Sequence, residues 1–255
     1  MKVAVCVKQA VDETDLRVDS SGAPMVSAAS TKVSVFDKNA VEEALRLKAK
    51  AGGEVVVFCL GPPEARKTIK EVLAMGADRA VHVVGDAGSV DSMSTSYLLA
   101  KAIRRWGPFD AVLCAEGSSD TYSGQVPPML SEWLSLPFLG YAKRVEIGAS
   151  TVTAELSLED RVETVEAPIP FLASVVSEIN EPRYPTLIQI MQASKKQVEE
   201  VPAVDLAGGE LPRATSVTSL TALSMDRKRI IFSGPPEETA KKLLDALRGE
   251  GVIQK

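Results

Sequence analysis

The chain has 255 residues, of which 45% are apolar and only 5% aromatic, and its formal net charge is -5. This length allows one large α/β domain, or one domain with an extension, around a core of Val, Leu, Ile and Ala. The negative charge argues against a general nucleic-acid-binding protein, which needs a basic surface to neutralise phosphates.

Cysteine usage and the apolar runs bear on the cellular compartment. Cys6, Cys59 and Cys114 are far apart and form no CxxC spacing, so we expect buried free thiols and a reducing environment. The start, MKVAVCVKQA, lacks the pattern of a signal peptide. No apolar run approaches the roughly 20 residues that cross a bilayer. We therefore expect a cytoplasmic protein that does not insert into membranes.

Strands and helices are predicted to alternate through the first half of the chain. The β-branched run Lys2–Val7 predicts a buried strand. After a turn-rich passage (residues 12–30), helical spacing predicts a helix that Asp37 or Asn39 caps and Gly52 ends. Similar patterns predict strands at Glu54–Leu60, Arg79–Val84 and Asp110–Ala115, and helices at about Glu64–Met75, Ser92–Trp106 and Pro128–Leu134. This alternation is typical of a parallel sheet with helices on both faces.

The pattern changes after Pro137. Alternating apolar residues over residues 143–168 predict an antiparallel meander, and Phe171–Val176 a returning buried strand. Residues 192–231 are mostly polar and are interrupted by Pro202 and Pro212, which suits an arm that needs a partner or a disordered linker. A late helix is expected from Gly234, with Pro235 and Pro236 at its start. We expect an α/β domain over residues 1–191 and an arm with a helix over residues 192–255.

Ligands of open parallel sheets bind at the carboxyl ends of the strands, where helix N-termini offer N–H groups. The corresponding loops here are Val7–Val11, Ser34–Asn39, Leu60–Pro63 and Ala115–Pro127. The last contains small and hydroxyl residues that permit close approach to a phosphate. An ordinary polar loop is the alternative reading of this pattern.

Catalytic motifs are missing from the sequence. It has no GxxxxGK(S/T) and no GxGxxG after the first strand, and its single histidine, His82, lies in a predicted strand. No Ser or Cys lies in a nucleophile elbow. The chain is therefore expected to bind a molecule rather than transform it.

One segment is unusual for a soluble protein: SEINEPRYPTLIQIMQASKK, residues 177–196. Pro182 and Pro185 exclude a regular helix or a central strand in its first half. Leu187, Ile188 and Ile190 then place large apolar side chains after this stiff stretch.

Four stretches, VAVCVKQAVD, NAVEEALRLK, AMGADRAVHV and NEPRYPTLIQIMQASKK, together resemble the beta subunit of electron transfer flavoproteins. The resemblance covers residues 1–200 clearly and the rest more loosely. It implies an α/β fold with a Rossmann-like parallel sheet of the adenine-nucleotide-binding type, an antiparallel extension and a C-terminal arm that packs on an alpha subunit. It also implies a non-catalytic electron carrier, with FAD held mainly by the alpha subunit and AMP or a second, bifurcating FAD in this subunit.

The resemblance assigns this nucleotide to the same strand ends. The implied cofactor-binding residues are Cys6, Ser34, Val35, Phe36, Asp37, Leu60, Ala115, Glu116, Gly117, Ser118, Ser119, Asp120, Thr121, Tyr122, Ser123, Gly124, Gln125 and Val126. Adenine would rest against backbone near Cys6 and Phe36, and phosphate on the amides of Ser123–Val126. Gln125-Val126-Pro127 departs from the Gln-Thr-Gly of many AMP-binding members and is closer to bifurcating members. The choice between AMP and FAD stays open because Pro127 lacks an N–H.

The resemblance also implies a docking role for residues 180–191, which we call the docking segment. Leu187 occupies the position of a leucine that anchors partner dehydrogenases, and Tyr184 and Ile188 would dock beside it. Arg183 would dock as well, or reach toward the flavin or the alpha subunit. The implied partners are the alpha subunit, flavin dehydrogenases such as acyl-CoA dehydrogenases, and a quinone oxidoreductase. Core packing is the alternative for Leu187, Ile188 and Ile190, and core or subunit-interface packing is the expectation for Ile190 and Met191.

Two other functions are compatible with the residues alone. One is a stand-alone adenine-nucleotide-binding enzyme or sensor, whose turnover would depend on Asp120 or Ser123. The other is an interaction subunit with an empty pocket. The absent phosphate motifs count against the first.

Overall fold

The computed structural model describes residues 1–86, 90–222 and 228–253. Residues 1–220 form one compact unit, and residues 221–255 form a second. None of the helices in the described ranges is long and apolar enough to cross a lipid bilayer.

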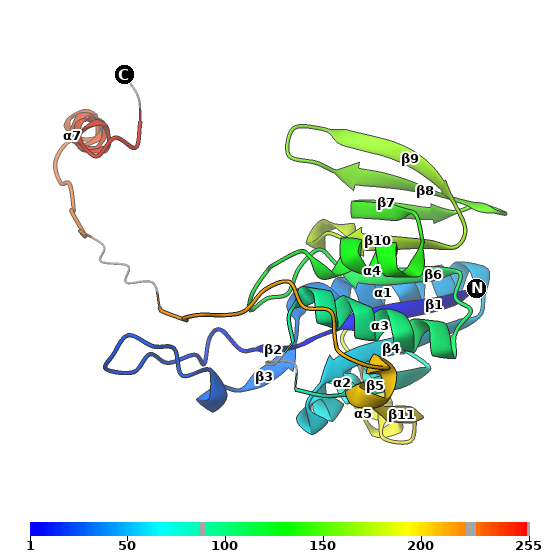
Figure 1. The fold of residues 1–255 in the computed structure, drawn as a ribbon. Coiled ribbons are helices and arrows are strands. Elements are labelled where there is room, and N and C mark those ends of the chain that lie inside the picture. Colours follow the sequence, from blue (N-terminus) through cyan, green and yellow to red (C-terminus); the bar gives the residue numbers. More distant parts are fainter. Residues whose placement is uncertain (87–89, 223–227, 254–255) are drawn as a thin grey trace. The chain divides into compact units, whose positions relative to one another are not determined.

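A nine-stranded sheet forms the centre of the first unit (Figure 1). Its strands are β1 (Lys2–Val7), β4 (Glu54–Gly61), β5 (Arg79–Val84), β6 (Ala111–Ala115), β7 (Phe138–Ile147), β8 (Thr151–Ser157), β9 (Val162–Pro168), β10 (Phe171–Val175) and β11 (Val198–Pro202). Their spatial order is β11-β5-β4-β1-β6-β10-β7-β8-β9. Neighbouring strands pair in parallel from β11 to β7, and β8 and β9 add antiparallel pairs.

Helices cover both faces of this sheet, as predicted. They are α1 (Val35–Ala51), α2 (Arg66–Met75), α3 (Ser92–Trp106), α4 (Val126–Leu134), α5 (Leu187–Ala193) and α6 (Ala203–Ala207), with short 3-10 turns at Val26–Ala28, Pro63–Ala65 and Ser177–Ile179. Strand β1 shows why two layers form, because its side chains alternate. Val3 and Val5 pack in the cluster of α1 and α2, whereas Ala4 and Cys6 pack in the cluster of α3 and α4.

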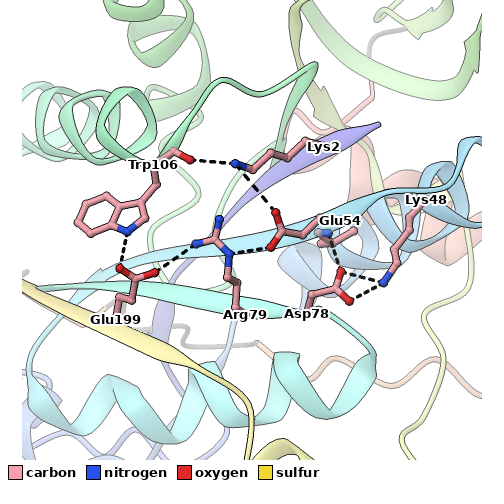
Figure 2. A network of polar contacts seen from close by, with 8 residues as sticks. Lys2, Lys48, Glu54, Asp78, Arg79, Trp106 and Glu199 are labelled. Atoms are coloured by element: carbon pink, nitrogen blue, oxygen red, sulfur yellow. Dashed lines mark hydrogen bonds and ion pairs between the residues drawn. The ribbon is translucent and has the colours of Figure 1, made fainter.

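The amino ends of four neighbouring strands are joined by a polar network (Figure 2). Arg79 on β5 contacts Glu54 on β4 at 2.7 Å and Glu199 on β11 at 3.4 Å. The indole of Trp106 donates to Glu199, and Lys2 on β1 donates to the carbonyl oxygen of Trp106. These contacts hold β11 at the edge of the sheet and occupy the end opposite the predicted ligand loops.

The expected start of the first helix is wrong. Helix α1 begins at Val35, its N-cap is Ser34, and no side chain caps it. Asp37 does not cap because its carboxylate accepts a hydrogen bond from the backbone N–H of Lys8. Asn39 does not cap because its amide donates to the carbonyl oxygens of Ser177 and Asn180.

Three strands were not expected from the sequence: β2 (Gln9–Val11), β3 (Thr31–Val33) and β11. Strands β2 and β3 pair with each other on either side of the turn-rich passage. The predicted antiparallel meander is present, but β7 also pairs in parallel with β10. Strand β11 extends the sheet beyond β5, so the compact unit continues past the expected boundary at residue 192 to Leu220.

The second unit contains the predicted late helix, α7 (Pro236–Gly249). Pro236 occupies its first turn, together with Glu237 and Glu238. None of its residues is buried.

Candidate functional site at the carboxyl ends of the strands

Four segments that are distant in the sequence meet at the carboxyl ends of β1, β4 and β6. The backbone N–H of Ser119 donates to the hydroxyl of Ser34 at 3.2 Å, which joins the loop after β6 to the start of α1. The rings of Phe36 and Tyr122 lie edge to face with centroids 5.4 Å apart. We call Cys6–Lys8, Ser34–Asp37, Leu60 and Ala115–Val126 the strand-end site.

This place is also where the chain changes direction within the sheet. The chain passes from β1 outward to β4 and β5 on one side, and then returns to β6 on the other side of β1. Helices α1 and α4, which follow β1 and β6, therefore lie on opposite faces of the sheet. In open α/β sheets, ligands usually bind outside the strand ends at such a point. The topology and the sequence patterns select the same edge.

Apolar and neutral side chains form the floor of the site. Cys6, Leu60 and Cys114 are buried in one cluster beneath α3 and α4. The hydrogen bond with Cys6, together with burial, raises the pKa of the Cys114 thiol well above its ordinary value. The Cys114 thiol therefore stays protonated. As predicted, Cys6, Cys59 and Cys114 are buried and free.

Asp37 is the most perturbed carboxyl group of the site. Burial raises its pKa to about 8, although the hydrogen bond from the backbone of Lys8 and the charge of Lys8 act in the opposite direction. That hydrogen bond is 2.6 Å long. Asp37 is therefore mainly neutral at pH 7, and it links β1 to α1 instead of presenting a charge to a ligand.

Lys8 is the residue of this site that the sequence reasoning missed. Its ammonium group lies 2.6 Å from Asp120, and it also donates to the hydroxyls of Ser118 and Thr121. Burial would raise the pKa of Asp120, but these contacts with Lys8 and Ser118 lower it below its ordinary value. Lys8 was detectable as the first charged residue after a strand that is buried on both faces.

The loop after β6 leaves several groups available to a ligand. The hydroxyl oxygen of Ser119 is buried and has no hydrogen-bond partner among the described residues. Gly124 has a φ of +64°, which turns the chain toward the first turn of α4. Val126 opens that helix, and Pro127 and Pro128 follow it without N–H groups. The donors at this helix start are therefore few.

An unsatisfied buried hydroxyl costs about 1–3 kcal/mol, which a ligand atom that bonds to it would recover. Ser119 lies in the loop that also contains Gly117 and Gly124, where the backbone can come close to a phosphate. A side chain at Gly117 would collide with the ring of Tyr122. The donor set and the small residues therefore fit a nucleotide phosphate better than a metal. No cluster of metal-ligating side chains occurs within the described ranges.

The docking segment is exposed, and its second half is a helix. Thr186 caps α5 through a capping box with Gln189, and this Thr-x-x-Gln spacing is a sequence signal for a helix start. The exposed fractions are 90% for Tyr184, 80% for Leu187, 67% for Ile188, 50% for Ile190 and 73% for Met191. Core packing within this chain is therefore excluded for all five residues, including Ile190 and Met191, for which it was one expectation.

His82 has the structural position that the sequence suggested. It is fully buried on β5, and its Nε2 lies 3.2 Å from the carbonyl oxygen of Gly61 on β4. His82 therefore lies outside the strand-end site.

Comparisons with known proteins agree with one another. A family model described as electron transfer flavoprotein domain matches residues 25–206. Three curated relatives named electron transfer flavoprotein subunit beta each align with 99% of this chain. They come from Thermoanaerobacterium thermosaccharolyticum (34% identical, 100% of its length), Clostridium acetobutylicum (31%, 92%) and Bacillus subtilis (32%, 100%).

Among solved structures, a DNA/pantothenate metabolism flavoprotein from Streptococcus pneumoniae aligns with 65% of this chain and 91% of its own. Its identity is 10% and its TM-score 0.25, values that support no inference about this chain.

Proposed function

The chain belongs to the electron transfer flavoprotein family, as a beta subunit, and from this we propose that it pairs with an alpha subunit that holds FAD. We also propose that it binds a second adenine nucleotide, AMP or FAD, at its strand-end site. The observation that carries the second proposal is the buried hydroxyl of Ser119, which has no hydrogen-bond partner in the described part of the chain. It lies in a glycine-containing loop at the switch point of the sheet.

The residues of this chain would bind and orient the nucleotide. Cys6 and Phe36 would border the adenine, and the loop around Ser119 and Gly124 would approach the phosphate. A flavin supplies the redox chemistry when bound, and the protein supplies distance, orientation and electrostatic environment. Lys8 holds the loop through Asp120, so it keeps these groups in place rather than reacting.

The proposed electron path ends at other proteins. Leu187 and Ile188 would dock on a flavin dehydrogenase, for example an acyl-CoA dehydrogenase, and electrons would continue to a quinone oxidoreductase. An exposed leucine at the start of a capped helix loses little entropy on docking, which suits a transient contact. A cytoplasmic location is part of the proposal and follows from the three unpaired thiols.

The nucleotide itself is the best test of this proposal. The chain would be co-expressed with its alpha subunit, the yellow heterodimer purified, and the nucleotides released by denaturation and weighed. We expect either one FAD and one AMP, or two FAD, per heterodimer. A heterodimer that releases FAD alone, in a one-to-one ratio, would contradict the second site.

A matched pair of variants assigns that nucleotide to the site. Ser119→Ala should lower the content of the second nucleotide while the first FAD stays at one per heterodimer. Ser157→Ala, at the end of β8, serves as the control and should leave both contents unchanged.

A further inference from the structure

Glu42 is a buried carboxylate that holds the docking segment. It lies on α1, in the part of the helix that follows the strand-end site, and its side chain is only 5% exposed. Arg183 approaches it from the docking segment and makes three hydrogen bonds to it. The backbone N–H of Arg183 donates at 3.2 Å, Nε at 2.7 Å and Nη2 at 2.9 Å.

This contact is a fork of charge-assisted hydrogen bonds, which has a defined geometry. Arg46 also donates to Glu42, from one turn further along α1, at 3.3 Å. Burial would raise the pKa of Glu42, but the hydrogen bonds from Arg183 outweigh it and lower the pKa below its ordinary value. Glu42 is therefore ionised, and it forms an ion pair with the half-exposed side chain of Arg183.

A second set of contacts fixes the start of the same segment. The amide of Asn39 donates to the backbone carbonyl oxygens of Ser177 and Asn180. In return, the amide of Asn180 donates to the carbonyl oxygen of Asn39 and to the carboxylate of Glu43. One surface of α1 thus binds both the backbone and the side chains of the segment just before its apolar part.

These contacts lie immediately before the exposed apolar side chains. Only Tyr184, Pro185 and Thr186 separate Arg183 from Leu187, and Pro185 restricts the backbone there. Thr186 then caps α5. The contact of Arg183 with Glu42 therefore fixes the chain four residues before Leu187.

We propose that Glu42 is a positioning residue for electron transfer, which acts through Arg183 to present Leu187 in the orientation that a dehydrogenase partner binds. The inference rests on the proposed function, because it assumes that the docking segment binds that partner. Without Glu42 the segment samples other orientations, and the apparent affinity for the partner falls in proportion to the competent fraction.

The test uses the heterodimer and a purified acyl-CoA dehydrogenase that reduces the wild-type protein. Glu42→Ala should raise the apparent KM for the dehydrogenase by about tenfold, as expected if about a tenth of the molecules remain competent. The maximal rate and the flavin content should stay near wild-type values. Glu42→Gln, which keeps the shape of the side chain, should give a smaller increase and guards against misfolding of the alanine variant.

A matched control comes from the same helix. Lys38 on α1 forms a 2.7 Å ion pair with Glu71 on α2, and this pair includes no residue of the docking segment. Glu71→Gln should leave the KM unchanged. Amide hydrogen exchange should become faster over residues 181–193 in the Glu42 variants but not in Glu71→Gln.

Leu187→Ala separates the two proposals. If Leu187→Ala and Glu42→Ala each raise the KM and the double variant adds little, the positioning role is supported. If Leu187→Ala raises the KM but Glu42→Ala does not, the positioning role is overturned and docking stands. An unchanged KM for Leu187→Ala removes the proposed docking, and the positioning role with it.

Discussion

At the scale of single residues, two buried carboxyl groups on α1 differ in protonation state. Burial keeps Asp37 neutral, whereas Arg183 keeps Glu42, five residues further along the helix, ionised. Each carboxyl group therefore joins α1 to a distant segment in a different protonation state. Asp37 contacts the end of β1, and Glu42 contacts the docking segment.

The neutral state of Asp37 predicts a pH dependence of stability. Its pKa rises from 3.8 to about 8 on folding, so between these values the native state retains a proton that the unfolded state releases. Stability from this group is thus complete below pH 3.8 and is lost as the pH rises toward 8. Relative to wild type, Asp37→Asn should therefore gain stability from pH 5 to pH 8, by at most about 1.4 kcal/mol per pH unit.

Urea unfolding of both proteins at pH 5, 6, 7 and 8 measures this difference. A difference in unfolding free energy that does not change with pH would show that Asp37 is ionised in the folded protein.

At the scale of elements, the N-terminus of α3 ties a late part of the chain to the sheet unit. Asp91 caps α3 by accepting from the backbone N–H of Ser94. Its other oxygen accepts from the backbone N–H groups of Ala214 and Thr215. Burial would raise the pKa of Asp91, but these hydrogen bonds outweigh it and lower the pKa far below its ordinary value. The cap therefore holds residues 214–215, near the end of the first unit, at the N-terminus of α3.

Asp91→Ala should destabilise the chain by about 1–2 kcal/mol, because it removes a helix cap and frees the segment that the cap holds. Asp91→Asn keeps an oxygen acceptor and should lose less. Thermal unfolding measures the loss, and amide exchange at Ser94, Ala214 and Thr215 locates it. Wild-type protection at Ala214 and Thr215 in the alanine variant would be evidence against the contact.

At the scale of the whole molecule, the two units differ in how many apolar side chains they bury. The first unit has its own core on both faces of the sheet. The second unit exposes Ile231, Leu243, Leu244 and Val252. Ala240, Leu243, Leu244 and Leu247 follow helical spacing along α7, which is typical of a face that a partner covers. We propose that the alpha subunit covers this face.

Removal of residues 221–255 should leave the unfolding temperature of the isolated chain nearly unchanged, since α7 has no buried residues. The shortened chain should bind the alpha subunit more weakly, because the apolar face of α7 is lost. Calorimetry of the chain and titration with the alpha subunit measure the two effects. Equal affinity of the full and shortened chains would exclude this role for α7.

The sequence by itself determined most of the strands, most helices and the family. Runs such as Lys2–Val7 are apolar at consecutive positions because both faces of that strand are covered, and glycines such as Gly52 and Gly76 end helices through local backbone geometry. These signals depend on residues that are close in the sequence, so they predict strands and helix ends without knowledge of the tertiary structure. The sequence also predicted that the strand-end segments lie close together, because parallel strands place their carboxyl ends at one edge. The contacts of Ser34 with Ser119 and of Phe36 with Tyr122 agree with this proximity.

Only the tertiary structure decided the contacts between distant segments. Strand β11 joins β5 through backbone hydrogen bonds that carry no sequence signature. Glu42 and Arg183 are 141 residues apart, and each alone reads as an ordinary surface charge. The sequence predicted Asp37 as a helix cap. In the fold, its carboxyl group accepts a hydrogen bond from the backbone N–H of Lys8 instead. The energies of such groups depend on which partners and how much burial the fold supplies, and these are properties of the assembled chain.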